Sequence, residues 1–173
     1  MAETLPEVWL RGPLEDIPQL LQPAAHALLQ AVEEIKELMK NFPASSLNER
    51  PAGVASPAFH LLHITGVLDR LCTYAKGAAL SPVQLAHLKA EELPPSQTVS
   101  ALVAKLDQQV QQTLEQFKQT DEKTLTDVRT VGRRALPSTV QGLLFHAADH
   151  TMRHLGQLLV TVRMIEAKKQ TSL

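Results

Sequence analysis

Three histidines recur at four-residue intervals in the stretch HAADHTMRH, at positions 146, 150 and 154. In a helix, residues four apart lie one turn above another on the same face, so two such imidazoles can bind one divalent ion. His150 and His154 share a face with the apolar residues Leu143 and Leu158. We therefore expect both imidazoles to point into the protein, with His146 at the edge of the same face.

A third ligand would have to come from another helix. The stretch FHLLHITGVLDRL places His63 on an apolar helical face, with His60 about a quarter turn away. Ligands on facing helices of a bundle can converge in its core. His63, His150 and His154 could then hold one ion and leave a coordination position for water or substrate.

The same histidines have an ordinary interpretation, because a buried imidazole can simply be a hydrogen-bonded residue of the core. A zinc peptidase of the HExxH type is disfavoured, since Thr151 stands where that motif has its glutamate. Candidate acids and bases beside the histidines are Asp69, Asp149 and His146. We expect Asp149 on the solvated face and Asp69 in a surface ion pair with a nearby arginine, either Arg70 or Arg153.

The elements that must position these residues are mainly helical. Apolar periodicity predicts long helices over residues 17–42, 56–76, 96–119 and 138–167. Ser56 followed by proline is typical of a helix start, and Gly77 is typical of a helix end. Ser81 and Pro82 predict a short extra helix. Residues 121–137 are polar, contain the only plausible extended piece, DVRTVGRRALP, and predict an irregular crossover before the last helix. The pattern predicts an all-α protein, a four-helix bundle.

Composition limits the function classes. The chain has 173 residues, of which 44% are hydrophobic, and we expect one domain with an extended N-terminal lead over 1–13 and a tail over 168–173. Lys plus Arg number 17 against 18 for Asp plus Glu, which argues against a nucleic-acid partner. One cysteine excludes an internal disulfide. Neither a leader nor an apolar run of about 18 residues is found, so we expect no membrane partner and a cytoplasmic location.

The stretches SPAFHLLH and HAADHTMRHLGQLL resemble two motifs of the DinB-like superfamily of metalloenzymes. In the second, His150, His154, Gly156 and Gln157 match the family's terminal His-x-x-x-His-x-Gly-Gln pattern. LNERPAGVAS and LLQPAAHALLQAVEEI are similar to the family's loop and first helix, so the resemblance covers nearly the whole chain. Two positions depart from the usual pattern: Ala55 stands where many members have an aromatic residue, and Leu155 where many have arginine.

The resemblance implies a four-helix bundle with an unusual connection order, often assembled as a homodimer. It places the family's metal triad on His63, His150 and His154 and implies one divalent ion, usually zinc or nickel. It leaves His146 and Gln157 as candidates for supporting roles around the ligands.

Two reactions follow from such a site. The ion could activate water for hydrolysis of a small molecule, or it could activate a low-molecular-weight thiol for transfer to an electrophile, as in some thiol transferases of the family. A different class also fits the sequence, namely a metal-binding or stress-associated bundle without turnover. The absence of an obvious general base beside the triad favours that alternative.

Overall fold

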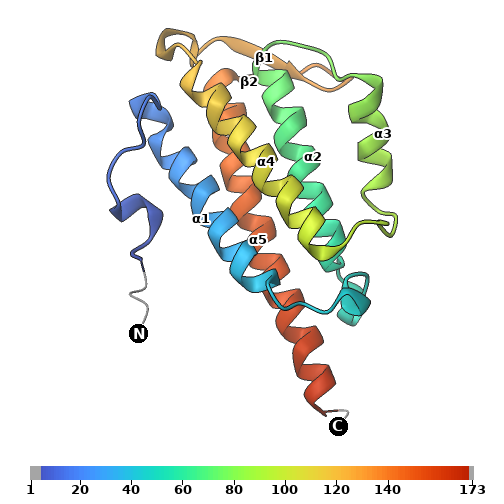
Figure 1. Cartoon of the computed structure of the whole chain (residues 1–173). Helices are drawn as coiled ribbons and strands as arrows, with labels where there is room; N and C mark the ends of the chain where they lie inside the picture. Colours follow the sequence, from blue (N-terminus) through green and yellow to red (C-terminus); the bar gives the residue numbers. More distant parts are fainter. Residues whose placement is uncertain (1–4, 172–173) are drawn as a thin grey trace.

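The fold is given by a computed structural model that describes residues 5–171. Its helices and strands are α1 (Gln22–Met39), α2 (Pro57–Ala75), α3 (Pro82–Ala90), α4 (Val99–Lys118), β1 (Val128–Val131), β2 (Leu136–Thr139) and α5 (Val140–Thr171). The long helices α1, α2, α4 and α5 form the expected four-helix bundle, with α3 as the short extra helix (Figure 1).

The order of helices around the bundle differs from their order along the chain. Helix α5 packs against α1 and α2, and α4 packs against the same two helices on the other side. Adjacent helices α1 and α5 run in one direction, and α2 and α4 run in the other (Figure 1). Because α2 and α4 are parallel neighbours, the chain must return between them, and α3 makes that return along α2. The connection order is thus not the simple sequential one, in agreement with the unusual order that the resemblance implies.

The core lies between the four long helices, and its largest fully buried side chains include Leu28, Ile35, Leu61, Leu68, Leu106, Phe117, Leu144 and Leu158. Within each helix they are separated by 7, 11 or 14 residues, which is close to a whole number of turns, as the apolar periodicity predicts. Leu20 falls within the helix predicted over residues 17–42 but is 59% exposed, because the α-helix begins only at Gln22 and a 3-10 turn precedes it. None of the described helices combines the length and apolar character that crossing a membrane requires.

The helix that carries His63 has well-defined ends. The Ser56 hydroxyl accepts a hydrogen bond from the Phe59 amide at 3.2 Å. Pro57 occupies the first turn, where a backbone N–H has no partner within the helix, so the missing N–H of proline costs no hydrogen bond. Gly77 follows the helix with φ of +74°, a conformation that glycine adopts without strain. His63 therefore lies in the second turn of a helix whose start is held by a side-chain cap.

The crossover before α5 is more regular than expected. It contains an antiparallel hairpin in which Val128 pairs with Thr139 and Val131 with Leu136. Gly132 and Ala135 have positive φ values of 68° and 47° at the two ends of the connecting turn. Strands of four residues are too short to show a clear alternation of apolar and polar residues, which is why periodicity did not predict them.

The described parts of the expected lead and tail are tied to the bundle. Val8 is buried, and its amide donates a hydrogen bond to the Gln30 side chain of α1 at 2.9 Å. Trp9 is 60% exposed, and its indole donates to the Glu7 carboxylate. The expected tail is helical, since α5 continues to Thr171. Residues 1–4 of the lead and 172–173 of the tail lie outside the described residues.

Candidate metal centre

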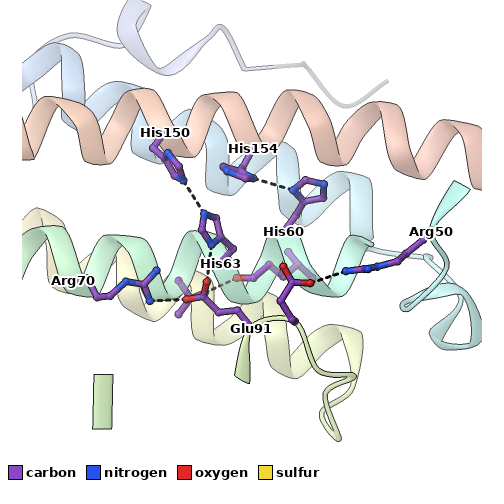
Figure 2. A network of polar contacts seen from close by, with 10 residues as sticks. Arg50, His60, His63, Arg70, Glu91, His150 and His154 are labelled. Atoms are coloured by element: carbon purple, nitrogen blue, oxygen red, sulfur yellow. Dashed lines mark hydrogen bonds and ion pairs between the residues drawn. The ribbon is translucent and has the colours of Figure 1, made fainter. Parts of the chain in front are cut away.

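Helices α2 and α5 bring three imidazoles together where they face each other. His63 comes from α2, and His150 and His154 lie one turn apart on α5 (Figure 2). One ring nitrogen of each lies within 4.8 Å of the other two. The Nε2 atoms of His63 and His150 are 2.9 Å apart. All three side chains are partly exposed, so a small molecule can reach them from solvent. The residues of the predicted triad are thus neighbours in space.

Burial keeps the α5 imidazoles in the neutral form that binds metal ions. It lowers the pKa of His150 to about 4 and that of His154 to about 3, and electrostatic repulsion from His63 is the next cause in both cases. A metal ligand must present a lone pair, and a protonated imidazole has none. At neutral pH both side chains are therefore ready to bind a cation without first losing a proton.

A buried carboxylate sets the hydrogen-bonding state of His63. Its Nδ1 lies 2.7 Å from Oε2 of Glu91, the residue that follows α3. A carboxylate can only accept, so Nδ1 carries the proton in the neutral ring, and Nε2 keeps a lone pair directed at His150. Carboxylates hold metal-binding histidines in this way in known metal sites. Figure 2 shows His63 between Glu91 on one side and His150 on the other.

A fourth histidine borders the cluster. His60 is buried, and its Nδ1 lies 3.0 Å from Nδ1 of His154. Burial, with repulsion from His63, lowers the pKa of His60 to about 4. Two neutral imidazoles share a single hydrogen between these nitrogens, so one ring donates and the other accepts. If His154 donates, its Nε2 keeps a lone pair for an ion.

The donor set is compatible with a divalent cation. Within residues 5–171, Nδ1 of His150 is buried and has no hydrogen-bond partner. A histidine kept for core hydrogen bonding would have both ring nitrogens paired. Tetrahedral zinc with ligand bonds of about 2.0–2.1 Å separates its nitrogens by roughly 3.4 Å, which small side-chain movements here would reach. These residues can therefore hold the ion that the family resemblance implies.

The other predicted residues lie at the rim or in solvent. His146 is exposed, 3.4 Å from Asp149, and its ring centroid is 5.3 Å from that of His150. Asp149 is exposed and pairs with Arg153 at 3.1 Å, as expected for a solvated face. Gln157 is exposed, and no hydrogen bond of its side chain is found in the described part of the chain. Its expected contact with a ligand is not seen.

The expected ion pair of Asp69 with Arg70 or Arg153 is wrong. Arg70 turns to Glu91, and Arg153 bonds Asp149 on its own helix. Asp69 instead lines a cavity of about 610 Å³ between α2, α3 and α4. The arginine is drawn to Glu91 because a buried carboxylate needs a charged partner more than a half-exposed one does.

Sequence reasoning missed Glu91 and the contact of His60, although two signals pointed toward Glu91. A glutamate at the C-terminal end of a helix opposes the helix dipole, which favours basic residues there. A glycine inside a helix, as at Gly66, often marks a place where another group comes close. Neither signal alone names the partner, since Glu91 follows His63 by 28 residues and a separate helix carries it into place.

Comparisons with known proteins agree with this fold. The sequence model of the DinB superfamily matches residues 27–158, which include all three histidines. A conserved protein from Enterococcus faecalis has 22% identity and a TM-score of 0.69, with 87% of this chain and 99% of that chain covered. A Streptococcus pneumoniae protein has 13% identity and a TM-score of 0.65, with 93% and 97% covered. No curated protein matches the chain. At these identities the two structures support the fold alone.

Proposed function

Since this chain belongs to the DinB superfamily, we propose that it is a metal-dependent enzyme in which His63, His150 and His154 bind one divalent ion, zinc or nickel. The observation that carries the proposal is the cluster of three imidazoles whose ligand atoms lie within 4.8 Å of one another. A three-histidine set leaves a coordination position for a further group, which is the arrangement of catalytic rather than structural zinc sites.

The proposed reaction is attack by water or by a small thiol on an electrophilic small molecule. An ion bound there would supply Lewis acidity, which makes water or a thiol a better nucleophile at neutral pH. The protein's own residues orient the site: Glu91 holds the His63 ring, and His60 lies against His154. The exposed His146 at the rim is the side chain best placed to accept or donate a proton at the mouth of the site.

One observation favours the alternative of a metal-binding bundle without turnover. Both oxygens of Glu91 are already bonded, one to His63 and the other to Arg70. The nearby Asp149 is paired with Arg153 and His146 at the surface. A carboxylate with both oxygens engaged is a poor general base. An enzyme built on this site would thus depend on the ion and on His146 for its chemistry.

The first test is metal content. We expect the untagged protein to contain close to one equivalent of zinc or nickel by plasma mass spectrometry, and His63→Ala, His150→Ala and His154→Ala each to lose most of it. His26→Ala is the matched control, because His26 is on α1 and bonds the Gly12 carbonyl instead. A wild-type protein that neither contains metal nor takes up added zinc or nickel would refute the site.

The second test separates the two reaction classes from the alternative. The metal-loaded protein is assayed with activated esters, and with an electrophile plus a low-molecular-weight thiol. We expect turnover in one of the assays, loss of it in His150→Ala, and a reduction of at least tenfold in His146→Ala. Stoichiometric metal without turnover in either assay would favour the non-catalytic bundle.

A further inference from the structure

Helix α3 is attached to the bundle in an unusual way, because none of its residues from Pro82 to Ala90 is buried. Polar contacts hold it instead. Near its start, the Gln84 side chain donates a hydrogen bond to the Thr73 hydroxyl of α2 at 2.7 Å. Just after its end, Glu91 is buried against α2. Since α3 runs back along α2, Glu91 returns to the level of His63 (Figures 1 and 2).

The carboxylate of Glu91 has two partners on α2. Its Oε2 lies 2.7 Å from Nδ1 of His63, and its Oε1 lies 2.5 Å from Nη1 of Arg70. Arg70 and Glu91 are both buried, so each charge is neutralised mainly by the other. Through its carboxylate, Glu91, the residue that follows α3, is therefore bonded to the candidate ligand His63 on α2.

The carboxylate reaches α2 because Gly66 has no side chain. A Cβ atom at this position would clash with Oε1 of Glu91 and would lie 2.6 Å from Nη1 of Arg70. Gly66 is one turn from both His63 and Arg70 on the same helix, so it leaves a notch between them. Glycine is disfavoured inside a helix relative to alanine, and here it creates space for an ion pair.

We propose that Glu91, held by Arg70 in the notch at Gly66, is the positioning residue of His63. It keeps the proton of the neutral ring on Nδ1, directs Nε2 toward His150, and so links the docking of α3 to the occupation of the metal centre. The part that concerns the ion rests on the proposed function, whereas the effect on the His63 ring does not require an ion.

The linkage works in both directions. If Glu91 strengthens ion binding by holding His63, a bound ion must strengthen the docking of Glu91 by the same free energy. Helix α3 has no buried residue of its own, so the free energy needed to detach it from α2 should depend on how strongly Glu91 is held. We therefore expect hydrogen exchange of the α3 amides to slow when zinc is added to the full-length protein.

The test uses two variants that leave all the histidines in place, Glu91→Ala and Gly66→Ala, with Glu92→Gln as the matched control. Glu92 is the adjacent glutamate, but it is exposed and pairs with Arg50 at 2.8 Å. Nitrogen-15 NMR of the metal-free protein at neutral pH reports which ring nitrogen of His63 is protonated. We expect Nδ1 in the wild type and in Glu92→Gln, and a shift toward Nε2 in both test variants.

Zinc affinity, measured by competition with a chromophoric chelator, is the second readout. Removal of such a partner typically weakens binding by about 10- to 100-fold, which is the loss expected for Glu91→Ala and Gly66→Ala. Gly66→Ala leaves the Glu91 carboxylate intact and carries the test alone if Glu91→Ala does not fold. The same His63 tautomer in wild type and variants would overturn the proposal, as would unchanged zinc affinity.

The result also distinguishes failure of this inference from failure of the proposed function. A wild type that binds no zinc but shows the expected change of tautomer in the variants refutes the metal centre and retains Glu91 as the residue that orients His63. A wild type that binds zinc as tightly as both variants retains the metal centre and refutes the role of Glu91.

Discussion

At the scale of single residues, the buried imidazole of His60 and the partly buried imidazoles of His150 and His154 make the metal-free protein sensitive to acid. The pKa values of His60, His150 and His154 fall to about 4, 4 and 3, from an ordinary value of 6.5. Between pH 6.5 and about 3, the unfolded chain therefore binds protons that the folded chain does not. Stability from these groups is complete above pH 6.5 and is lost as the pH falls toward the folded pKa values.

We expect the free energy of unfolding of the chelator-treated protein, measured with urea, to fall between pH 7 and pH 4.5. Carboxylates also titrate at the lower end of this range, so His60→Leu is compared with wild type. Because it removes one buried imidazole, this variant should show a shallower dependence of the free energy of unfolding on pH. Equal slopes in His60→Leu and wild type would contradict the assignment.

The triad could be predicted from sequence because its members follow helical periodicity. His150 and His154 are one turn apart, and His63 is flanked by apolar residues on its own face. Glu91 could not be predicted in this way, since its contact with His63 depends on how α3 returns along α2. His60 was placed about a quarter turn from the His63 face, and its contact with His154 follows from how closely α2 approaches α5.

At the scale of elements, the N-terminal caps of α2 and α4 can be tested as a matched pair. Ser56 begins α2 and Thr98 begins α4, and each hydroxyl accepts one amide hydrogen bond at 3.2 Å. We expect Ser56→Ala and Thr98→Ala each to cost about 1 kcal/mol of stability, measured by urea denaturation. Only Ser56→Ala should also weaken zinc binding, because its helix carries His63 about two turns beyond the capped end. Equal zinc affinity in both variants would contradict this difference.

The helix boundaries that were predicted best are those with a capping residue or a terminating glycine in the sequence. Ser-Pro pairs mark the starts of α2 and α3, and Gly77 marks the end of α2. The start of α4 was predicted at residue 96 and lies at Val99, because Thr98 and not Ser96 caps it. The β1–β2 hairpin was missed since its pairing is a contact between short segments and leaves no long-range period in the sequence.

At the scale of the whole molecule, α5 carries an exposed apolar seam on its outer face. Phe145, Met152 and Leu159 are seven residues apart and are 62%, 37% and 40% exposed. Gly156 lies on the same side, with open space around the position of its absent Cβ. His154 is on the opposite side of the helix, since about two and a half turns separate it from Phe145. Apolar residues at a spacing of seven are typical of a helix that pairs with another helix.

We expect the seam to pair with the same seam of a second copy, giving the homodimer that the family resemblance implies. Light scattering should give about twice the 19.0 kDa mass of one chain. Phe145→Glu combined with Leu159→Glu should give the monomer mass and leave the zinc content unchanged. Val83→Glu, on the exposed face of α3, is the control and should remain dimeric. A monomeric wild type at micromolar concentration would contradict the expectation.

The order of helices around the bundle was not predictable from periodicity. Apolar stripes show that the helices have buried faces, but they do not say which helix lies beside which. The resemblance implies only that the connection order is unusual, and the fold shows the order itself: α3 provides the return that makes α2 and α4 parallel. The extent of the domain over the whole chain stays a prediction.

Trp9 is the chain's single tryptophan, and it lies exposed in the lead rather than in the core. Its fluorescence in the folded protein should already resemble that of a solvated indole, so emission will change little when the four helices unfold. A melting curve recorded by fluorescence is therefore expected to show little of the transition that circular dichroism records, even if the bundle unfolds in a single step.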